Sequence, residues 1–146
     1  MRNVILWLHI GAAGTWLGAN MFQLVGGPLV RKAGAATESA WLRAVVDLSK
    51  RLYPPAAILA LLTGIELVRR GAWSYGDVFV MIGITMVVFG AVVGSALIGP
   101  WSTRLIEAID TGGESASLRN RLNGITILET ALVLFTIYAM VAKLGA

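Results

Sequence analysis

Four long apolar runs, separated by short segments that carry nearly all the charges, constrain the fold of this chain more than any other feature. They extend from about Val4 to Val30, Leu52 to Val68, Val78 to Ile98 and Leu122 to Ala142. A membrane-crossing helix needs about 20 predominantly apolar residues. Backbone groups in lipid must be satisfied within the segment, so each run is predicted to be a helix. The sequence therefore predicts an all-α bundle of four transmembrane helices in one domain, residues 1–146.

The composition excludes several classes of function. Only 14% of the residues are charged, against about 25% in soluble domains. Cysteine is absent, which excludes disulfides and thiolate metal sites. The excess of four positive charges lies in the segments between apolar runs, where basic residues orient a chain in the bilayer. We therefore expect the lipid bilayer, and no nucleic acid, as the partner of this surface.

The distribution of lysine and arginine predicts the orientation. Four basic residues lie on the side of the termini and eight in the first and third connections, namely Arg31, Lys32, Arg43, Lys50, Arg51, Arg104, Arg119 and Arg121. The positive-inside rule then places these connections in the cytoplasm and both termini outside.

The two longer connections have sequence patterns of their own. Thr37–Arg51 has a helical pattern with Thr37 as its predicted N-cap, and Pro54 and Pro55 are expected to kink or restart the next helix. The chain is thus predicted to form two hairpins, each with a cytoplasmic helical elbow. Glu38–Arg43 and Glu114–Arg119 match at five of six positions, which indicates either a parallel internal repeat or coincidence.

His9 is the single histidine of the chain, one or two turns inside the first apolar run. A charged side chain in hydrocarbon costs about 2.5–3.5 kcal/mol, and histidine is the commonest ligand of metals and haem iron. One interpretation is a haem ligand, a copper ligand or a proton acceptor; the other is a neutral histidine bonded to a threonine or glutamate across the bundle. A five-coordinate haem would need His9 alone. A second ligand could come from His9 of another copy, or from Met81, Met86 or Met140.

Polar and small residues occupy opposite stripes of the first predicted helix. At about 100° per residue, one stripe holds His9, Trp16, Asn20 and Gln23. These side chains should point into the bundle, because lipid offers them no partner. Glycines on the other stripe and on the third helix allow close packing on a neighbouring helix or on a second copy of the chain; these are Gly14 with Gly18, and Gly90 with Gly94.

Two carboxylates lie within the apolar runs. Glu66 is interpreted either as a proton relay or metal ligand facing His9, or as an ion pair with Arg70 four residues on. Glu129 lies deeper and must be protonated, paired or next to water. Its expected partners are Asn20 or Gln23 at similar depth, or Arg104 or Arg121 reaching inwards.

The start of the last predicted helix is basic. Arg121 and Asn123 follow Arg119 there, and the arginines serve either as positive-inside anchors or as a site for an anionic group such as a porphyrin propionate. Tyr53, Trp41 and Trp101 are expected near the same inner interface. The sequence contains no nucleophile–base triad, Gly-rich phosphate loop or HExxH motif, which excludes hydrolase and kinase chemistry.

Several short segments resemble one family. Leu8-His9-Ile10 followed by Trp16-Leu17-Gly18 resembles the first helix of the HemJ and CopD-like membrane proteins. Lys50-Arg51-Leu52-Tyr53, with Pro55 and Thr63-Gly64, is similar to their second helix, and Arg121-Leu122-Asn123 to the start of their last one. The resemblance covers most of the chain and implies their four-helix plan.

The resemblance also implies a function. HemJ-type proteins are protoporphyrinogen oxidases with haem b, and CopD-type proteins are linked to copper handling, so His9 would take the haem-associated histidine position. The third run lacks the HemJ lysine, and Asn123-Gly124 stands where HemJ has an Asn-Glu pair, which favours a sister branch of the superfamily. We expect a redox protein of the bacterial inner membrane that binds haem b or a porphyrin through His9, with Met86, Arg121 and Asn123 as further candidate residues. The alternative is a cofactor-free membrane component, for copper handling or as a partner subunit in transport.

Overall fold

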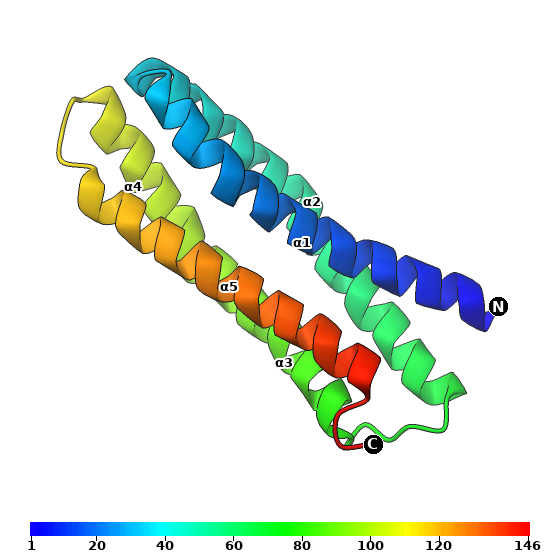
Figure 1. The fold of residues 1–146 in the computed structure, drawn as a ribbon. Helices are drawn as coiled ribbons and strands as arrows, with labels where there is room; N and C mark the ends of the chain where they lie inside the picture. The colour runs from blue at the N-terminus through cyan, green and yellow to red at the C-terminus, as the bar shows by residue number, and fades with distance from the viewer.

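The computed structural model describes residues 1–146 as an all-α protein made of two helical hairpins that lie side by side (Figure 1). The first hairpin pairs α1 (Arg2–Lys32) with α2 (Ala35–Arg70). In the second, α5 (Ala116–Ala142) pairs with a continuous rod formed by α3 (Val78–Val93), the π-helical turn η1 (Gly94–Ile98) and α4 (Gly99–Asp110). The four rods form a ring in which α2 contacts the α3–α4 rod and α1 contacts α5.

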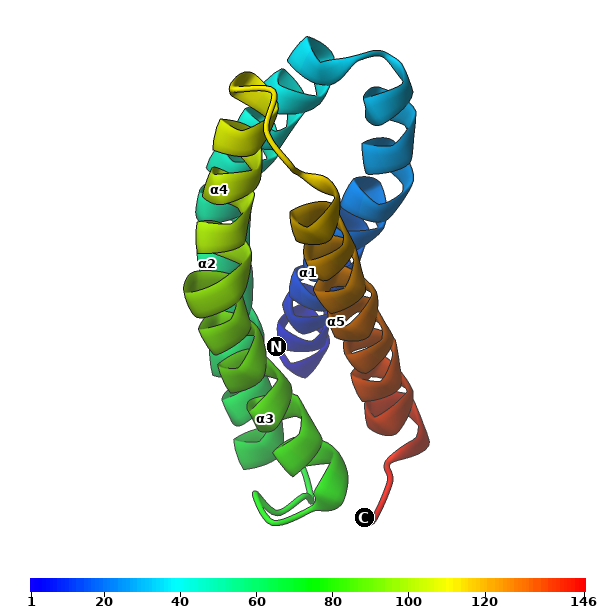
Figure 2. The same cartoon turned by 90° about the vertical axis from the view of Figure 1, so that its left-hand side faces the viewer.

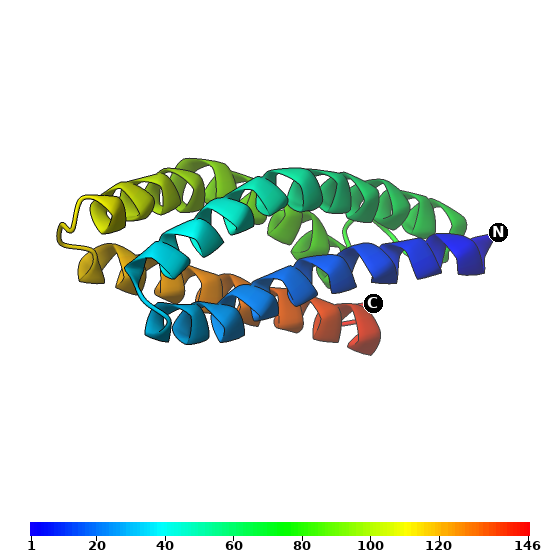
Figure 3. The same ribbon diagram turned by 90° about the horizontal axis from the view of Figure 1, so that it is seen from above.

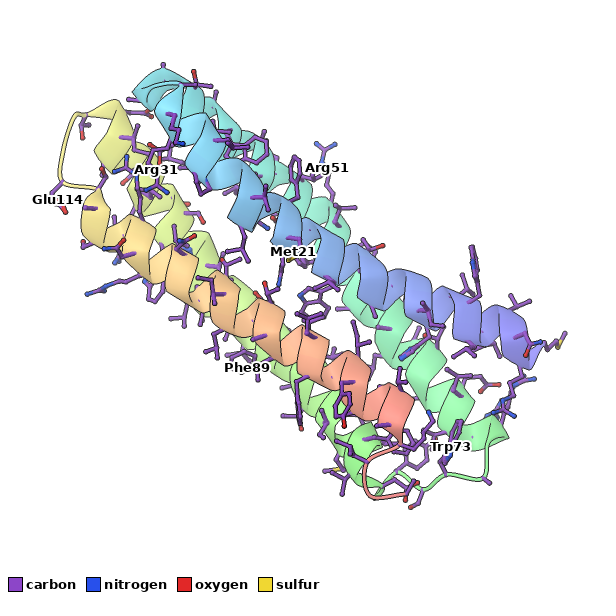
Figure 4. All side chains as sticks on the ribbon, viewed as in Figure 1. Met21, Arg31, Arg51, Trp73, Phe89 and Glu114 are labelled. Atoms are coloured by element: carbon purple, nitrogen blue, oxygen red, sulfur yellow. The ribbon has the colours of Figure 1, made fainter.

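The two ends of the bundle differ. The end that holds the α1–α2 and α4–α5 connections is called the loop end, and the opposite end, where both chain termini lie, is called the terminal end (Figures 2 and 3). Arg31 and Glu114 lie at the loop end and Trp73 at the terminal end (Figure 4). Consecutive rods run in opposite directions, so the predicted arrangement of two hairpins is confirmed.

Three helical segments are long and apolar enough to cross a membrane: Ala35–Arg70, Val78–Asp110 and Ala116–Ala142. The first predicted span, in α1, is not among them, because the polar residues His9, Asn20 and Gln23 lower its mean hydropathy. The fourth crossing therefore stays a prediction. With 36 residues at about 1.5 Å each, α2 is about 54 Å long, which exceeds a hydrocarbon core of about 30 Å.

Continuous helices replace the predicted elbows. The α1–α2 turn consists of Ala33 and Gly34, and Gly34 has a φ of 107°, which favours glycine. Thr37 lies in the first turn of α2 and is not its N-cap. The helix then continues through Pro54 and Pro55, because packing along α1 holds the backbone helical where the prolines remove hydrogen bonds.

The rod of the second hairpin also passes a proline without breaking. Pro100 is the second residue of α4, just after η1, at whose end the amide of Gly99 donates to the carbonyl of Gly94, five residues back. A wider π-helical turn accommodates a local mismatch in the hydrogen-bond ladder, such as the one that a proline ring imposes. The third predicted span and the connection after it are therefore one rod.

Polar residues are buried in this bundle while large apolar residues are exposed. Asn20, Thr63, Glu129 and Thr130 are each less than 9% exposed. The outer surface instead carries exposed leucines, isoleucines, valines and phenylalanines on all four rods. Soluble monomers rarely expose apolar patches of this extent, whereas lipid tolerates them. The distribution is that of a helical membrane protein.

Candidate functional site

His9 is held against α2 by one of its two ring nitrogens. Nδ1 lies 3.0 Å from the carbonyl oxygen of Ala60 and 3.1 Å from the hydroxyl oxygen of Thr63. A carbonyl only accepts, so Nδ1 carries the hydrogen and donates it, while the hydroxyl of Thr63 donates onward to the carbonyl of Leu59 at 2.5 Å. The other nitrogen, Nε2, makes no hydrogen bond. A Cβ at Gly64 would lie 3.2 Å from the ring, so this glycine permits the close approach.

This geometry contains elements of both interpretations of His9. The hydrogen bond to Thr63 fits the interpretation of His9 as a neutral histidine bonded to a threonine across the bundle. A histidine whose Nδ1 donates to a carbonyl is also the usual form of a metal-ligating histidine, because that bond fixes the tautomer and leaves Nε2 as the ligand atom.

A second group of polar residues lies in the middle of the bundle. We call Trp16, Asn20, Gln23, Tyr53 and Glu129 the central cluster. The indole Nε1 of Trp16 donates to the carboxyl Oε1 of Glu129 at 3.1 Å, and both side chains are buried. The partner of Glu129 is thus Trp16, one turn before the predicted Asn20, and neither of the predicted arginines reaches it.

The rest of the central cluster is a chain of three hydrogen-bonded side chains. Gln23 donates through Nε2 to the hydroxyl oxygen of Tyr53 at 2.9 Å, and that hydroxyl donates to Oδ1 of Asn20 at 2.5 Å. Asn20 is 1% exposed, and its amide Nδ2 is the one buried side-chain nitrogen or oxygen without a partner. The edge of the Trp16 ring packs on Tyr53 at 6.0 Å between centroids.

Tyr53, which was expected near the inner interface, instead lies within the central cluster. The available signal was its hydroxyl group, since a buried tyrosine needs a hydrogen-bond partner. Asn20 and Gln23 on the facing stripe were the candidate partners.

Gly90 on α3 is what lets the cluster form. A Cβ there would lie 2.2 Å from Cζ2 of Trp16 and 3.4 Å from Oε1 of Glu129. The predicted glycine face of the third helix is therefore divided, because Gly90 packs inside the bundle while Gly94 has open space around it. Gly14 and Gly18 also have nothing within 4 Å, so the predicted outward glycine stripe of α1 is present.

Charged residues at the loop end join the two hairpins. Arg119 forms a two-pronged ion pair with Glu38, with both N–O distances at 2.7 Å. Glu38 comes from the first copy of the repeated hexapeptide and Arg119 from the second, so the two segments meet in space. Sequence analysis did not assign this pair, although the repeat marked both residues.

A second contact between the same elements involves Asp110. Ser39 donates to Asp110 at 2.6 Å, and Arg43 pairs with the other carboxyl oxygen. These bonds, chiefly that of the Ser39 hydroxyl, hold the pKa of the Asp110 carboxyl below its usual range. These loop-end contacts therefore fasten α2 to the α4–α5 end of the second hairpin.

Two cavities border the central cluster. One, of about 90 Å³, reaches from Glu38 and Arg119 at the loop end to Gln23 and Thr126. The other, of about 220 Å³, lies between α1 and α2 and has Gln23 and Tyr53 among mostly apolar neighbours. Neither is lined by His9.

The remaining predicted site residues are not gathered around His9. Met86 packs on Trp16, which lies seven residues after His9 on α1, and on Val133. Arg121 lies 6.0 Å over the ring of Trp101. Asn123 lines the cavity of about 90 Å³ at the loop end.

Glu66 accepts hydrogen bonds at the end of α2. It forms the ion pair with Arg70 that its spacing predicts and also binds Arg69, at 2.8 Å and 2.9 Å. It makes no hydrogen bond to His9. The ion-pair interpretation is therefore the one that the contacts fit.

In comparisons with known proteins, no family model, curated protein or solved structure matches this chain. The resemblance to the HemJ and CopD-like proteins therefore stays a prediction from the sequence.

Proposed function

We propose that this chain is a four-span protein of the bacterial inner membrane that binds haem b or a related porphyrin through His9 and serves in electron transfer or porphyrin oxidation. The observation that carries the proposal is the bond from Nδ1 of His9 to the carbonyl of Ala60. That bond leaves Nε2, the usual iron-binding atom, without a protein partner. When bound, the haem would supply the redox chemistry, and the protein would fix the imidazole and its surroundings.

The proposed topology places the loop end in the cytoplasm and both termini outside. Arg31, Arg43, Arg104 and Arg119 are among the eight basic residues toward the loop end, and four lie toward the terminal end. Basic residues prefer the cytoplasmic side. Because the rods are longer than the hydrocarbon core is thick, the loop end would project beyond the bilayer into the cytoplasm.

The donor set restricts how haem could be held. Cavities that enclose a small ligand have volumes of roughly 300–1,000 Å³, larger than the two cavities of about 90 and 220 Å³ that border the central cluster. Met86 belongs to the packing around Trp16, so it supplies no second ligand in this arrangement. The open stripe of Gly14 and Gly18 lies opposite His9, so a dimer through that stripe would keep the two imidazoles apart. These residues therefore fit a haem that would have His9 as its single protein ligand.

The test is a visible spectrum of the protein purified in mild detergent from haem-replete cells. We expect a Soret band that is lost in His9→Ala. In the matched control Thr63→Val the band should remain, because the Ala60 carbonyl still orients the ring. A colourless, folded wild-type protein, or a band that persists in His9→Ala, would refute the proposal.

The second candidate is a cofactor-free membrane component, for copper handling or as a partner subunit in transport. The observation that favours it is that His9 is already hydrogen-bonded to α2 and lines neither cavity. No three His, Asp or Glu side chains come together, so copper would depend on His9 and methionine. Copper retention that is lost in a His9→Ala, Met86→Leu double variant would support copper handling; a protein that retains neither haem nor copper would favour the partner subunit.

A further inference from the structure

Two side chains of the central cluster, Asn20 and Glu129, each have a polar atom without a hydrogen-bond partner in the protein. One is the Nδ2 amide nitrogen of Asn20, which is buried and without a partner. The other is the second carboxyl oxygen of Glu129, since the single hydrogen bond to this side chain is from Trp16 to Oε1. A buried donor left unpaired costs about 1–3 kcal/mol, and such groups in native proteins commonly hold ordered water.

These two side chains lie one turn from the cavity that reaches the loop end. Gln23 and Thr126, which line its inner part, are each three residues from Asn20 and Glu129 on the same helices. Three residues correspond to a rise of about 4.5 Å, close to the span of one water molecule between two polar atoms. At its other end the cavity is lined by Glu38 and Arg119.

The surroundings of Glu129 provide a donor but no positive charge. Trp16 faces it from α1, Tyr53 from α2 and Gly90 from α3, and α3 has no charged residue. Tyr53 is the one titratable group among them, and it donates its hydrogen to Asn20. The charged side chains of the cavity lie at its loop-end side.

We propose that Glu129 and Asn20 form a proton-binding site with a bound water molecule, which protons reach from the loop-end side of the bundle. A hydronium ion in the cavity gives its proton to the Glu129 carboxylate, which yields the neutral acid and one water; release is the reverse, with no other bond changed. Trp16 holds Oε1 in both states, and Asn20 orients the water toward the second oxygen. This inference requires no cofactor and does not depend on the proposed role of His9.

Infrared spectroscopy of the wild-type protein in lipid nanodiscs tests the inference through the carbonyl stretch of a protonated carboxyl group. We expect a band that decreases as the pH rises and that is lost in Glu129→Gln. That variant keeps the size of the side chain and an oxygen for Trp16, so the fold should be retained; a far-UV circular dichroism spectrum checks this. In the control Glu66→Gln, at the exposed end of α2, the band should remain.

Access is tested by transfer to heavy water. The Glu129 band should shift to lower frequency within the mixing time in the wild type and in Thr15→Val, a variant of a residue that lines only the other cavity, between α1 and α2. It should shift slowly, or not at all, in an Asn123→Leu, Thr126→Val variant, which fills the cavity of about 90 Å³ with apolar groups and leaves the central cluster intact. The inference is overturned by a wild-type band that does not respond to pH, by the absence of such a band, or by exchange that the double variant leaves unchanged.

Discussion

Gly90→Ala tests whether the central cluster depends on the close approach of α3. The added Cβ would lie 2.2 and 2.5 Å from Cζ2 and Cη2 of Trp16, whereas carbon atoms in contact are about 3.5–4.0 Å apart. The indole must therefore move by more than about 1 Å. Trp16 is 6% exposed and packs on Met86 and Val133, so it has little room in which to do so.

The expected loss of stability combines three effects. Overpacking a core costs about 1–3 kcal/mol, and weakening the buried bond from Trp16 to Glu129 costs about 1.5–3 kcal/mol. In the opposite direction, replacing a helical glycine by alanine stabilises the folded state by about 0.5–1 kcal/mol. Because the first two effects share one displacement of the ring, we expect a net destabilisation of about 2–4 kcal/mol.

The measurement is equilibrium unfolding in mixed micelles, with Gly124→Ala as the matched control. Gly124 lies in α5 with nothing within 4 Å of an added Cβ, so its variant should be as stable as the wild type or more stable by up to about 1 kcal/mol. In a double-mutant cycle, Gly90→Ala should cost much less in a Trp16→Phe background than in the wild type, because the smaller ring leaves room for the methyl group. A Gly90→Ala protein as stable as the control would refute the close contact.

Three further predictions concern the ion pairs and a second glycine. Glu38→Gln should lower the free energy of unfolding by about 1.5–3 kcal/mol, and in a double-mutant cycle Arg119→Gln should add much less to that variant than to the wild type; additive losses would contradict the pair. The pKa of Asp110 is depressed in the folded state by Ser39 and a neighbouring arginine, so its contribution to stability is complete at neutral pH and is lost as the pH falls through the acidic range. Ser39→Ala should reduce that acid sensitivity, and unfolding curves against pH with an unchanged slope would contradict this. Gly83→Ala should change stability by less than about 1 kcal/mol, since its Cβ would meet the end of a flexible methionine side chain, which can move aside; a loss as large as that of Gly90→Ala would show that this methionine is held rigidly.

The loop-end contacts have a consequence for the arrangement of the hairpins. Within each hairpin a short connection holds the two rods together, but between hairpins the α2–α3 connection lies at the terminal end. The pair of Glu38 with Arg119 and the bonds of Asp110 join the hairpins at the other end. They therefore hold the hairpins together beside the cavity of about 90 Å³, which Glu38 and Arg119 line.

Part of the site could be predicted from the helical period alone. The stripe that places Trp16, Asn20 and Gln23 on one face follows from 3.6 residues per turn, and these residues do face protein in the structure. The period does not give the depth of one helix relative to another. For that reason the partner of Glu129 was expected one turn away from the residue that binds it.

Proline produced the largest error in the helix boundaries. Pro54 and Pro55 each remove a backbone donor, which predicts a kink or a new helix at that point. Whether a helix continues past such a point depends on what packs beside it, and in this chain α1 supports α2, while a π-helical turn precedes Pro100.

The sequence by itself determined the class of fold, the hairpin order and the inward and outward faces of α1, because these depend on hydropathy and helical period, which are properties of each segment alone. Only the tertiary structure decided that Trp16 binds Glu129, that Tyr53 turns inward to Asn20, and that two distant hexapeptides meet through Glu38 and Arg119. Such contacts depend on the rotation and axial shift of one helix against another, which are set by the packing of side chains from both.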